Sequence, residues 1–367
     1  MAGLFMFGNA RPLGASAGYG ISVEHDGLGA AMYESWCEYH DIRGRAEVAM
    51  VGAYENYIMN TSQTEEQKVA LFEGVVGDIW EKIKAFFKKI AEKIKSWWNA
   101  AVKFFQSHFQ SDEEFLKKYK DEITAKDISK FTCSMYPWPK MTGGLGSLKE
   151  IASGVQKSID AGEKYFKDIS ESKEVNKENI SDKIKEAKKI IDSESYKAAK
   201  ESAPVDAKGG MGKFKTALTE SYRGKSKKEK KGLSGLLSVS TMISIIEDGK
   251  DVISDLKEAA DTVAEAADGF ADKVDAAVKA RPGGDEGEAK GENTRIVNGA
   301  VEVAKYSLSY ATAELEVMKS LASECMSECR SVLGAILRYS EPSKESSGYT
   351  WGANNKTSLM DAFSAGF

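Results

Sequence analysis

The stretch "DIWEKIKAFFKKIAEKIKSWWNAAVKFFQSHF", from Asp78 to Phe109, contains eight phenylalanine and tryptophan residues and seven lysines, without proline or glycine. Its apolar residues recur at intervals of three and four, which predicts one amphipathic helix about 40 Å long. We call the apolar face of this helix the aromatic stripe. It consists of Val76, Trp80, Ile83, Phe87, Ile90, Ile94, Trp97, Ala101 and Phe104, widened by Phe86, Trp98 and Phe105.

Most lysines of this helix fall on the side opposite the aromatic stripe, and residues 78–105 carry a local charge of +4. A basic amphipathic helix with tryptophan at its border is typical of segments that lie on an anionic membrane surface. Packing against other helices would instead gain roughly 1.5 to 3 kcal/mol for each large buried side chain, and an exposed stripe would favour aggregation. We therefore predict burial within the protein or at a protein interface, with membrane contact as the alternative.

Local signals around this helix predict that the chain is interrupted on both sides of it. Glycines at 74 and 77 predict a break or kink before the stripe. The stretch "CSMYPWPKMTGGLGS", residues 133–147, has the proline and glycine content of a loop. Capping patterns predict helix starts at Thr64 with Gln67, Asp78 with Glu81, and Ser111 with Glu114.

Two further apolar seams with the same three-and-four spacing occupy the carboxy-terminal half. Sustained over several heptads, this spacing is typical of packed antiparallel helices or a coiled coil, and it predicts a helical hairpin. The first seam contains Ile253, Leu256, Ala260, Val263, Ala267, Phe270, Val274 and Ala277. The second contains Ala304, Leu308, Ala311, Leu315, Met318, Ala322, Cys325, Cys329, Val332 and Ile336.

The composition agrees with a mostly helical protein. The 367 residues are 42% hydrophobic and 29% charged, with only six prolines. A net charge of −5 argues against a general nucleic-acid binder. The uncharged run from Gly232 to Ile246 is 15 residues long, shorter than the roughly 18 to 20 that span a bilayer, and predicts a buried helix. The predicted fold class is all-α, with long amphipathic helices packed as a bundle or as helical hairpins.

Composition shifts divide the chain into six predicted segments. The stretch "YRGKSKKEKKG", residues 222–232, holds six basic residues against one acid, and its core (223–231) reads as a solvated loop or as a contact for an acidic partner. The segments are a flexible glycine-rich leader (1–26), an aromatic and basic helical domain (27–136), a charged helical segment (140–203), a linker with the basic patch (204–232), a helical hairpin (233–340) and a flexible tail (341–367).

No pattern in the sequence predicts catalysis. Cys325 and Cys329 could offer two thiolates to a metal, but both fall on the apolar seam, which favours packing as small apolar residues. The stretch "KGGMGKFK", residues 208–215, lacks the first glycine and the final serine or threonine of a phosphate-binding loop. We therefore expect no enzyme activity, no cofactor, no metal and no small-molecule substrate.

Three stretches together resemble virion structural proteins of large tailed bacteriophages. They are "YESWCEYHDIRGRAEVAMVGAYENYIMN" (33–60), "FFKKIAEKIKSWW" (86–98) and "SDEEFLKKYKDEI" (111–123). In those proteins a lysine- and aromatic-rich helix precedes a D-x-x-F-x-x-K-Y-K segment, which here is Asp112, Phe115, Lys118, Tyr119 and Lys120. The resemblance covers about residues 30–125. It implies a non-enzymatic component of the particle, which could lie inside the head.

The resemblance sets the expected function and location. We expect a protein of the virion, assembled in the host cytoplasm, that packs with itself or with other virion proteins. The alternative is a membrane-active protein that uses the helix of residues 78–109, for example in genome delivery. Some large phages trim internal head proteins after a small-x-Glu tripeptide. Residues 22–24 and 53–55 have that form, but chance occurrence explains them better.

Overall fold

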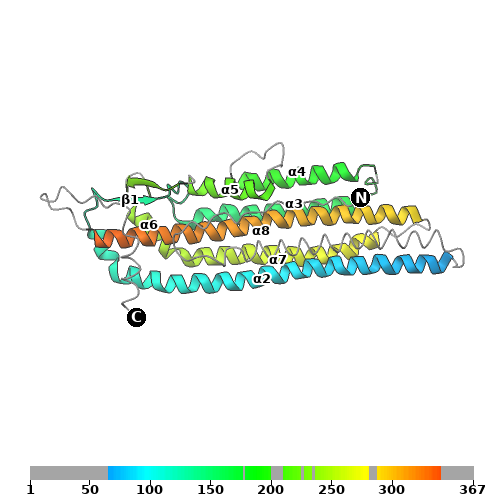
Figure 1. Cartoon of the computed structure of the whole chain (residues 1–367), viewed down its shortest axis with the longest axis horizontal. Helices are drawn as coiled ribbons and strands as arrows, with labels where there is room; N and C mark the ends of the chain where they lie inside the picture. Colours follow the sequence, from blue (N-terminus) through cyan, green and yellow to red (C-terminus); the bar gives the residue numbers. More distant parts are fainter. Residues whose placement is uncertain are drawn as a thin grey trace, which may run out of the picture.

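The computed structural model describes residues 65–176, 178–199, 210–224, 227–233, 236–280 and 287–339. These residues form an elongated bundle of helices with one two-stranded ribbon, which confirms the predicted all-α class (Figure 1). The helices are α2 (Glu65–Ala125), α3 (Lys149–Glu171), α4 (Ile180–Ala199), α5 (Gly210–Arg223), α6 (Val239–Glu247), α7 (Gly249–Ala280) and α8 (Gly287–Arg338). The predicted leader, the predicted tail and both small-x-Glu tripeptides lie outside the described residues.

The aromatic stripe belongs to a much longer helix than the sequence predicted. Helix α2 runs without interruption through 61 residues, a length of about 90 Å. The predicted starts at Asp78 and Ser111, and the break at Gly74 and Gly77, are therefore wrong. A cap contributes only about 1 kcal/mol. Burial on both sides of Ser111 outweighs that local signal, because the described buried face of α2 begins at Trp80 and continues beyond the stripe to Ile123.

The long helices lie side by side along the length of the molecule, with α2 and α4 on opposite edges (Figure 1). Helix α2 packs mainly against α7, and α8 packs mainly against α3. Helix α7 also contacts α3 and α8, while α4 and α5 pack on α8. The two predicted hairpin helices do touch, but each makes its most extensive contact with a helix from earlier in the chain.

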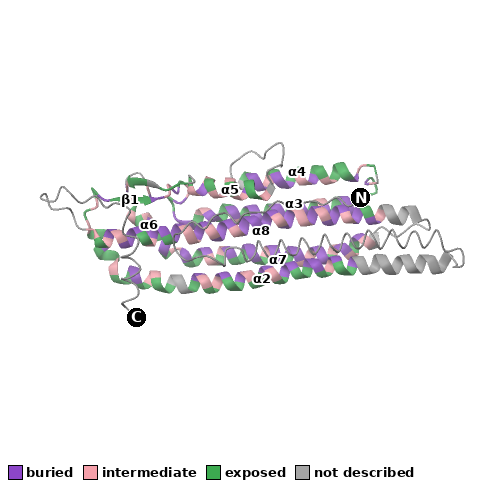
Figure 2. Ribbon diagram, viewed as in Figure 1, coloured by how far each residue is buried: buried purple, intermediate pink, exposed green. Residues whose placement is uncertain are grey.

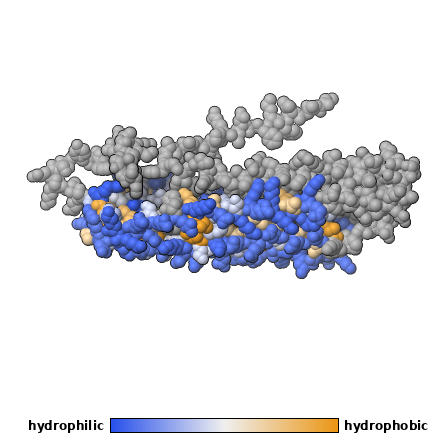
Figure 3. All heavy atoms as spheres, turned by 90° about the horizontal axis from the view of Figure 1, so that it is seen from below, coloured by the Kyte–Doolittle hydropathy of each residue, from blue (hydrophilic) through white to orange (hydrophobic). Residues whose placement is uncertain are grey.

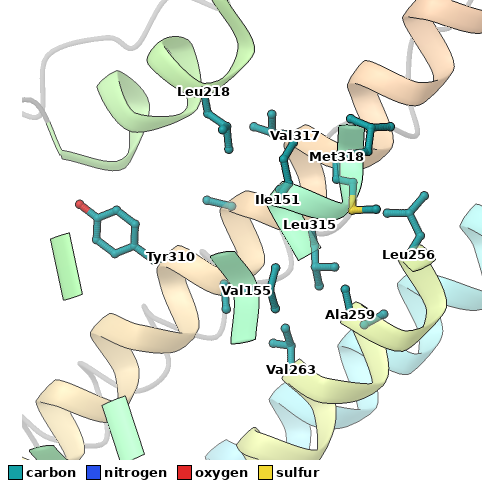
Figure 4. Close-up of a cluster of buried hydrophobic side chains, with 14 of the residues drawn as sticks. Ile151, Val155, Leu218, Leu256, Ala259, Val263, Tyr310, Leu315, Val317 and Met318 are labelled. Atoms are coloured by element: carbon teal, nitrogen blue, oxygen red, sulfur yellow. The ribbon is translucent and has the colours of Figure 1, made fainter. Parts of the chain in front are cut away.

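The buried centre of the bundle draws side chains from several helices at once (Figure 4). Ile151 and Val155 of α3 lie among residues of α7 and α8. Leu218 reaches the same region from α5. Because residues from four helices share one core, the described helices depend on one another for burial of their apolar faces (Figure 2).

One end of the bundle carries short β structure where the sequence predicted loops. Strand β1 (Thr132–Met135) pairs antiparallel with β2 (Glu229–Gly232), and a 3-10 helix, η1 (Leu145–Leu148), precedes α3. Four-residue strands are too short to show a clear alternation, so their pattern was not recognisable. The predicted loop at residues 133–147 and the predicted solvated loop at 223–231 are thus partly ordered as strands and a helical turn.

The apolar run from Gly232 to Ile246 ends in a helix, as predicted. Helix α6 begins after Ser238, whose hydroxyl oxygen accepts a hydrogen bond from the backbone N–H of Thr241 at 3.0 Å. Its four buried residues are Met242, Ile243, Ile245 and Ile246. The Ser238 cap places the helix start seven residues into the run.

Candidate functional site

The aromatic stripe, our main candidate for an interaction surface, faces the interior of the bundle (Figure 2). Trp97 and Phe104 are only partly buried and lie at its border. Seven of the nine predicted interface residues are buried: Trp80, Ile83, Phe87, Ile90, Ile94, Trp98 and Phe105. The side chain of Val76 lies outside those that are described. In this conformation the stripe is covered by the chain's own helices.

Aromatic contacts join α2 to the first carboxy-terminal seam. The ring centroids of Phe87 and Phe270 are 5.8 Å apart, and Phe166 of α3 lies 5.6 Å from Phe270 on its other side. All three side chains are buried. Ring separations in this range stabilise a pair beyond simple burial. These contacts link α2, α7 and α3 through a single phenylalanine.

Ion pairs border this apolar contact. Lys84 of α2 lies 2.9 Å from a carboxylate oxygen of Asp275, and Lys95 lies 3.4 Å from Asp268. Both acids belong to α7, and the order of the pairs shows that α2 and α7 run antiparallel. The exposed Lys95–Asp268 pair contributes only about 0.2 to 1 kcal/mol. These pairs set the register, while the buried rings provide most of the stabilisation.

A buried lysine covers the border of the stripe, and sequence reasoning missed it. Lys319 of α8 is only 7% exposed, and its Nζ lies 5.5 Å from the ring centroid of Trp97 and 5.7 Å from that of Phe104. An ammonium group over aromatic faces is attracted by their electron density. Lys319 directly follows the seam residue Met318, so only its neighbours in space could have revealed its role.

The segment that carries the bacteriophage resemblance is attached to the end of α8. Arg330 places its guanidinium 3.3 Å from the ring centroid of Phe115, and its Nε lies 3.2 Å from a carboxylate oxygen of Asp112. Lys120 forms a 2.6 Å ion pair with Glu247 of α6. Tyr119 packs beside Phe115 with their ring centroids 5.4 Å apart. The residues of this motif therefore fasten α2 to its neighbours.

The predicted helix–helix seam residues are all fully buried. On α7 they are Leu256, Val263 and Phe270, and on α8 they are Leu308, Leu315, Cys325 and Cys329. Burial raises the pKa of the Cys325 thiol well above its ordinary value, with a hydrogen bond to Cys329 adding to the effect. Across the described residues, no group of three or more His, Cys, Asp or Glu side chains is arranged to hold a metal ion.

A buried polar centre lies where α3, α4 and α8 meet, and the seam analysis did not find it. Glu314 of α8 is fully buried, and burial raises the pKa of its carboxyl well above the ordinary value. Ser158 Oγ of α3 lies 3.2 Å from Glu314 Oε2 and 2.9 Å from Ser195 Oγ of α4. The raised pKa favours the neutral acid, because an ionised carboxylate in this environment would be poorly solvated.

Two tyrosines continue this polar centre along α8. Tyr306 donates a 2.6 Å hydrogen bond to Asp192 Oδ1, and Tyr310 packs beside Tyr306 with their ring centroids 5.3 Å apart. Burial raises the pKa of both phenols, and the Asp192 carboxylate adds to the effect. Asp192 itself is buried. The Tyr306 bond adds a buried polar link between α4 and α8 to their apolar contact, where Ile180 and Ile184 lie against Gly299.

The basic patch is attached to α8 through Glu328. One carboxylate oxygen of Glu328 accepts hydrogen bonds from Trp138 Nε1 at 2.8 Å and from the backbone N–H of Tyr136 at 3.2 Å. The other oxygen pairs with Lys228 at 2.5 Å. Arg223 stacks 4.4 Å from the ring centroid of Tyr136. Two of the patch's basic side chains are therefore used to hold the β1–β2 ribbon on the bundle.

Trp138 has a backbone φ of 47°, a left-handed conformation that is uncommon for a residue other than glycine. Its indole is fully buried between α8 and the end of α5. The hydrogen bond to Glu328 and this burial hold the strained conformation in place.

Comparisons with protein-family models, with curated proteins and with solved structures find no match to this chain. Within the described part of the chain, every helix is too short or too polar to cross a membrane.

Proposed function

We propose that this chain is a non-enzymatic structural component of a bacteriophage particle, and that it acts by packing its helices with itself or with capsid partners. The proposal rests on the contacts that the D-x-x-F-x-x-K-Y-K segment, residues 112–120, makes with the rest of the bundle. Asp112 and Phe115 bind Arg330 of α8, and the aromatic stripe ahead of them packs along α7. The stretch of the resemblance at residues 33–60 lies outside the described residues. Its described part, from residue 65 on, belongs to α2 and forms one edge of a long helical bundle, which is the kind of element that a particle component supplies.

The distribution of stabilising contacts supports a structural role. Aromatic rings, a buried lysine and ion pairs along α2 all join it to other helices of the same chain. At the far edge, Asp192 and Ser195 fasten α4 to its neighbours. A bundle whose longest helix is about 90 Å offers long lateral faces to partners.

The test is the presence of the protein in particles. Phage particles would be purified on a density gradient, washed in high salt and digested for quantitative mass spectrometry. We expect peptides of this chain in the particle band at a constant ratio to the major capsid protein. Recovery of the protein only from the free fraction of infected cells would refute the proposal.

A membrane-active role is the second candidate, supported by the composition of the outer side of α2. Lys82, Lys88 and Lys103 are exposed there, and Trp97 at the border is only partly buried. Such a role would require α2 to leave α7, at the cost of exposing the aromatic stripe. Leakage of anionic liposomes by the intact protein, lost in Trp97→Asp, would support it. An intact vesicle population at every pH and salt concentration would remove it.

A further inference from the structure

A row of acidic side chains follows the exposed side of α7. Its members are spaced by seven, three, four and seven residues, so they fall within about 80° of the helix circumference and extend over about 32 Å. All are exposed. We call them the acidic row, and they are Asp251, Glu258, Asp261, Glu265 and Asp272.

The acidic row takes no part in the ion pairs that hold α7 in the bundle. Those pairs use other acids of the helix: Asp255 with Lys149, Asp268 with Lys95, and Asp275 with Lys84. Among the described residues, no member of the acidic row forms an ion pair. Like charges at helical spacing repel one another. Within the described residues the row therefore lacks a cationic partner, and Lys257 alone, exposed nearby, does not satisfy its preference for positive charge.

A complementary face lies on the neighbouring helix. The exposed side of α2 between residues 81 and 103 carries five lysines against two glutamates. Lys82, Lys88 and Lys103 mark its length, which is also about 32 Å. We call these three residues the basic face. Figure 3, seen from below, shows hydrophilic side chains extending along the described surface of the bundle.

We infer that copies of this chain associate side by side, with the basic face of α2 in one copy against the acidic row of α7 in the next. The two surfaces have opposite charge and equal length, so one contact would neutralise both. Formed once between two copies, this contact is heterologous and lets copies add in a row or ring; formed twice at once, it gives a symmetric dimer. This inference deepens the proposed structural role, because it names the surface through which the chain packs with itself.

The charges also favour a second copy over a polyanion. Helix α7 packs along α2, so an anionic membrane or nucleic acid that approached the basic face would also meet the acidic row. A partner that carries both signs avoids this penalty, and another copy of the chain does so.

Sedimentation velocity of the purified full chain provides the first test. We expect species larger than the monomer at about 20 mM salt, and an association constant at least roughly tenfold lower at about 500 mM, because exposed charges are screened at that ionic strength. A monomer at every salt concentration would overturn the inference. Association that is insensitive to salt would also overturn it.

A charge exchange provides the sharper test. One variant carries Lys82→Glu, Lys88→Glu and Lys103→Glu, and the other carries Glu258→Lys, Asp261→Lys and Glu265→Lys. Each variant alone should be monomeric, because its two faces now have the same sign. Mixed together, they should form a mixed complex, since each acidic face again meets a basic one. Failure of the mixture to associate would contradict the pairing.

Matched controls separate this contact from general charge effects and from misfolding. The variant Lys157→Glu, Lys167→Glu, Lys189→Glu changes net charge by the same amount as the first variant, at exposed positions on α3 and α4. It should associate like the unmodified chain. Circular dichroism should show native helix content in every variant, since all changes lie on exposed helix surface. Loss of association in this control would refute the assignment to α2 and α7.

Vesicles with about one third anionic lipid test whether an anionic membrane, instead of a second copy of the chain, binds the basic face. The folded monomer should remain unbound when the vesicles are sedimented at low salt. Binding that is lost in the α2 variant would assign the basic face to lipid and overturn the inference. Because these tests use isolated protein, they can fail while particles still contain the chain, and the particle test can fail while self-association holds.

Discussion

Two contacts in this bundle differ in the polar groups that they bury. Helix α2 meets α7 through buried rings such as Phe87 and Phe270, with ion pairs only at the border. Helices α3, α4 and α8 meet around a buried carboxyl, Glu314, with Ser158 and Ser195 beside it. A charged side chain introduced among the buried rings of the first contact would destabilise it. The second contains a carboxyl whose pKa is raised by burial, so the stability of this contact should vary with pH.

This difference determines whether each contact is weakened by the loss of apolar side chains or also by a change in pH. An apolar seam loses stability in proportion to the side chain removed, whatever the pH. A buried acid adds a dependence on solution conditions that the apolar seam lacks. Substitutions that target each contact separately should therefore produce different responses, and the following predictions run from the largest expected effect to the smallest.

Replacing Phe87 with aspartate should disrupt the α2–α7 contact most severely. The change removes a fully buried ring and introduces a charge without a partner, so we expect a loss of about 4 kcal/mol or more. Urea unfolding followed by circular dichroism measures it. The matched change Ala85→Asp, on the exposed side of α2, should cost less than about 1 kcal/mol. Equal effects of the two substitutions would show that the stripe is not buried.

Replacing Glu314 with glutamine should change how stability varies with pH. The pKa of Glu314 is raised in the folded state, so its contribution is fully present below the ordinary value of 4.5 and is lost as pH rises toward the folded pKa. In that window the wild type should lose up to about 1.4 kcal/mol per pH unit relative to Glu314→Gln. Urea midpoints from pH 5 to 8 test this. The exposed control Glu171→Gln should run parallel to the wild type.

Replacing Gly162 with alanine tests how closely α3 approaches α8. A Cβ at this position would lie 2.3 Å from Cβ and Oγ of Ser307, so the helices must shift. We expect a net loss of about 1 to 2 kcal/mol, because overpacking exceeds the gain in helix propensity. Gly269→Ala meets nothing within 4 Å and should gain about 0.4 to 1 kcal/mol. A stabilised Gly162→Ala protein would contradict the close approach.

Replacing Lys95 with alanine should have the smallest effect. Its ion pair with Asp268 is exposed and 3.4 Å long, so the loss should be below about 0.5 kcal/mol. A double-mutant cycle with Asp268→Asn measures the coupling between the two side chains directly. A coupling above about 1 kcal/mol would mean that ion pairs stabilise the α2–α7 contact as much as its rings do.

Sequence patterns found the apolar contact but not the polar one. The three-and-four spacing identified the stripe through Phe87 and the seam through Leu315, because apolar periodicity is visible within a single helix. Glu314 and Lys319 stand beside seam residues of α8 as ordinary charged residues, and nothing local distinguishes them from the exposed Arg295. Their burial depends on α2, α3 and α4, which are far away in the chain.

The positions of the helix ends likewise depend partly on local sequence signals and partly on tertiary packing. The capping patterns at Asp78 and Ser111 are real local signals, yet α2 continues through both. Each signal is small compared with the burial available along α7, so tertiary packing overrides it. At Ser238 no stronger effect opposes the cap, and α6 begins there.

The sequence by itself determined the helical class, the aromatic stripe and both carboxy-terminal seams, because these follow from the period of apolar residues along one helix. Only the tertiary structure decided which seams meet: α7 with α2, and α8 with α3. It also decided that Asp112 and Phe115 bind Arg330, and that Glu314 is buried. Those outcomes depend on contacts between residues far apart in the chain, whose energies no local pattern contains.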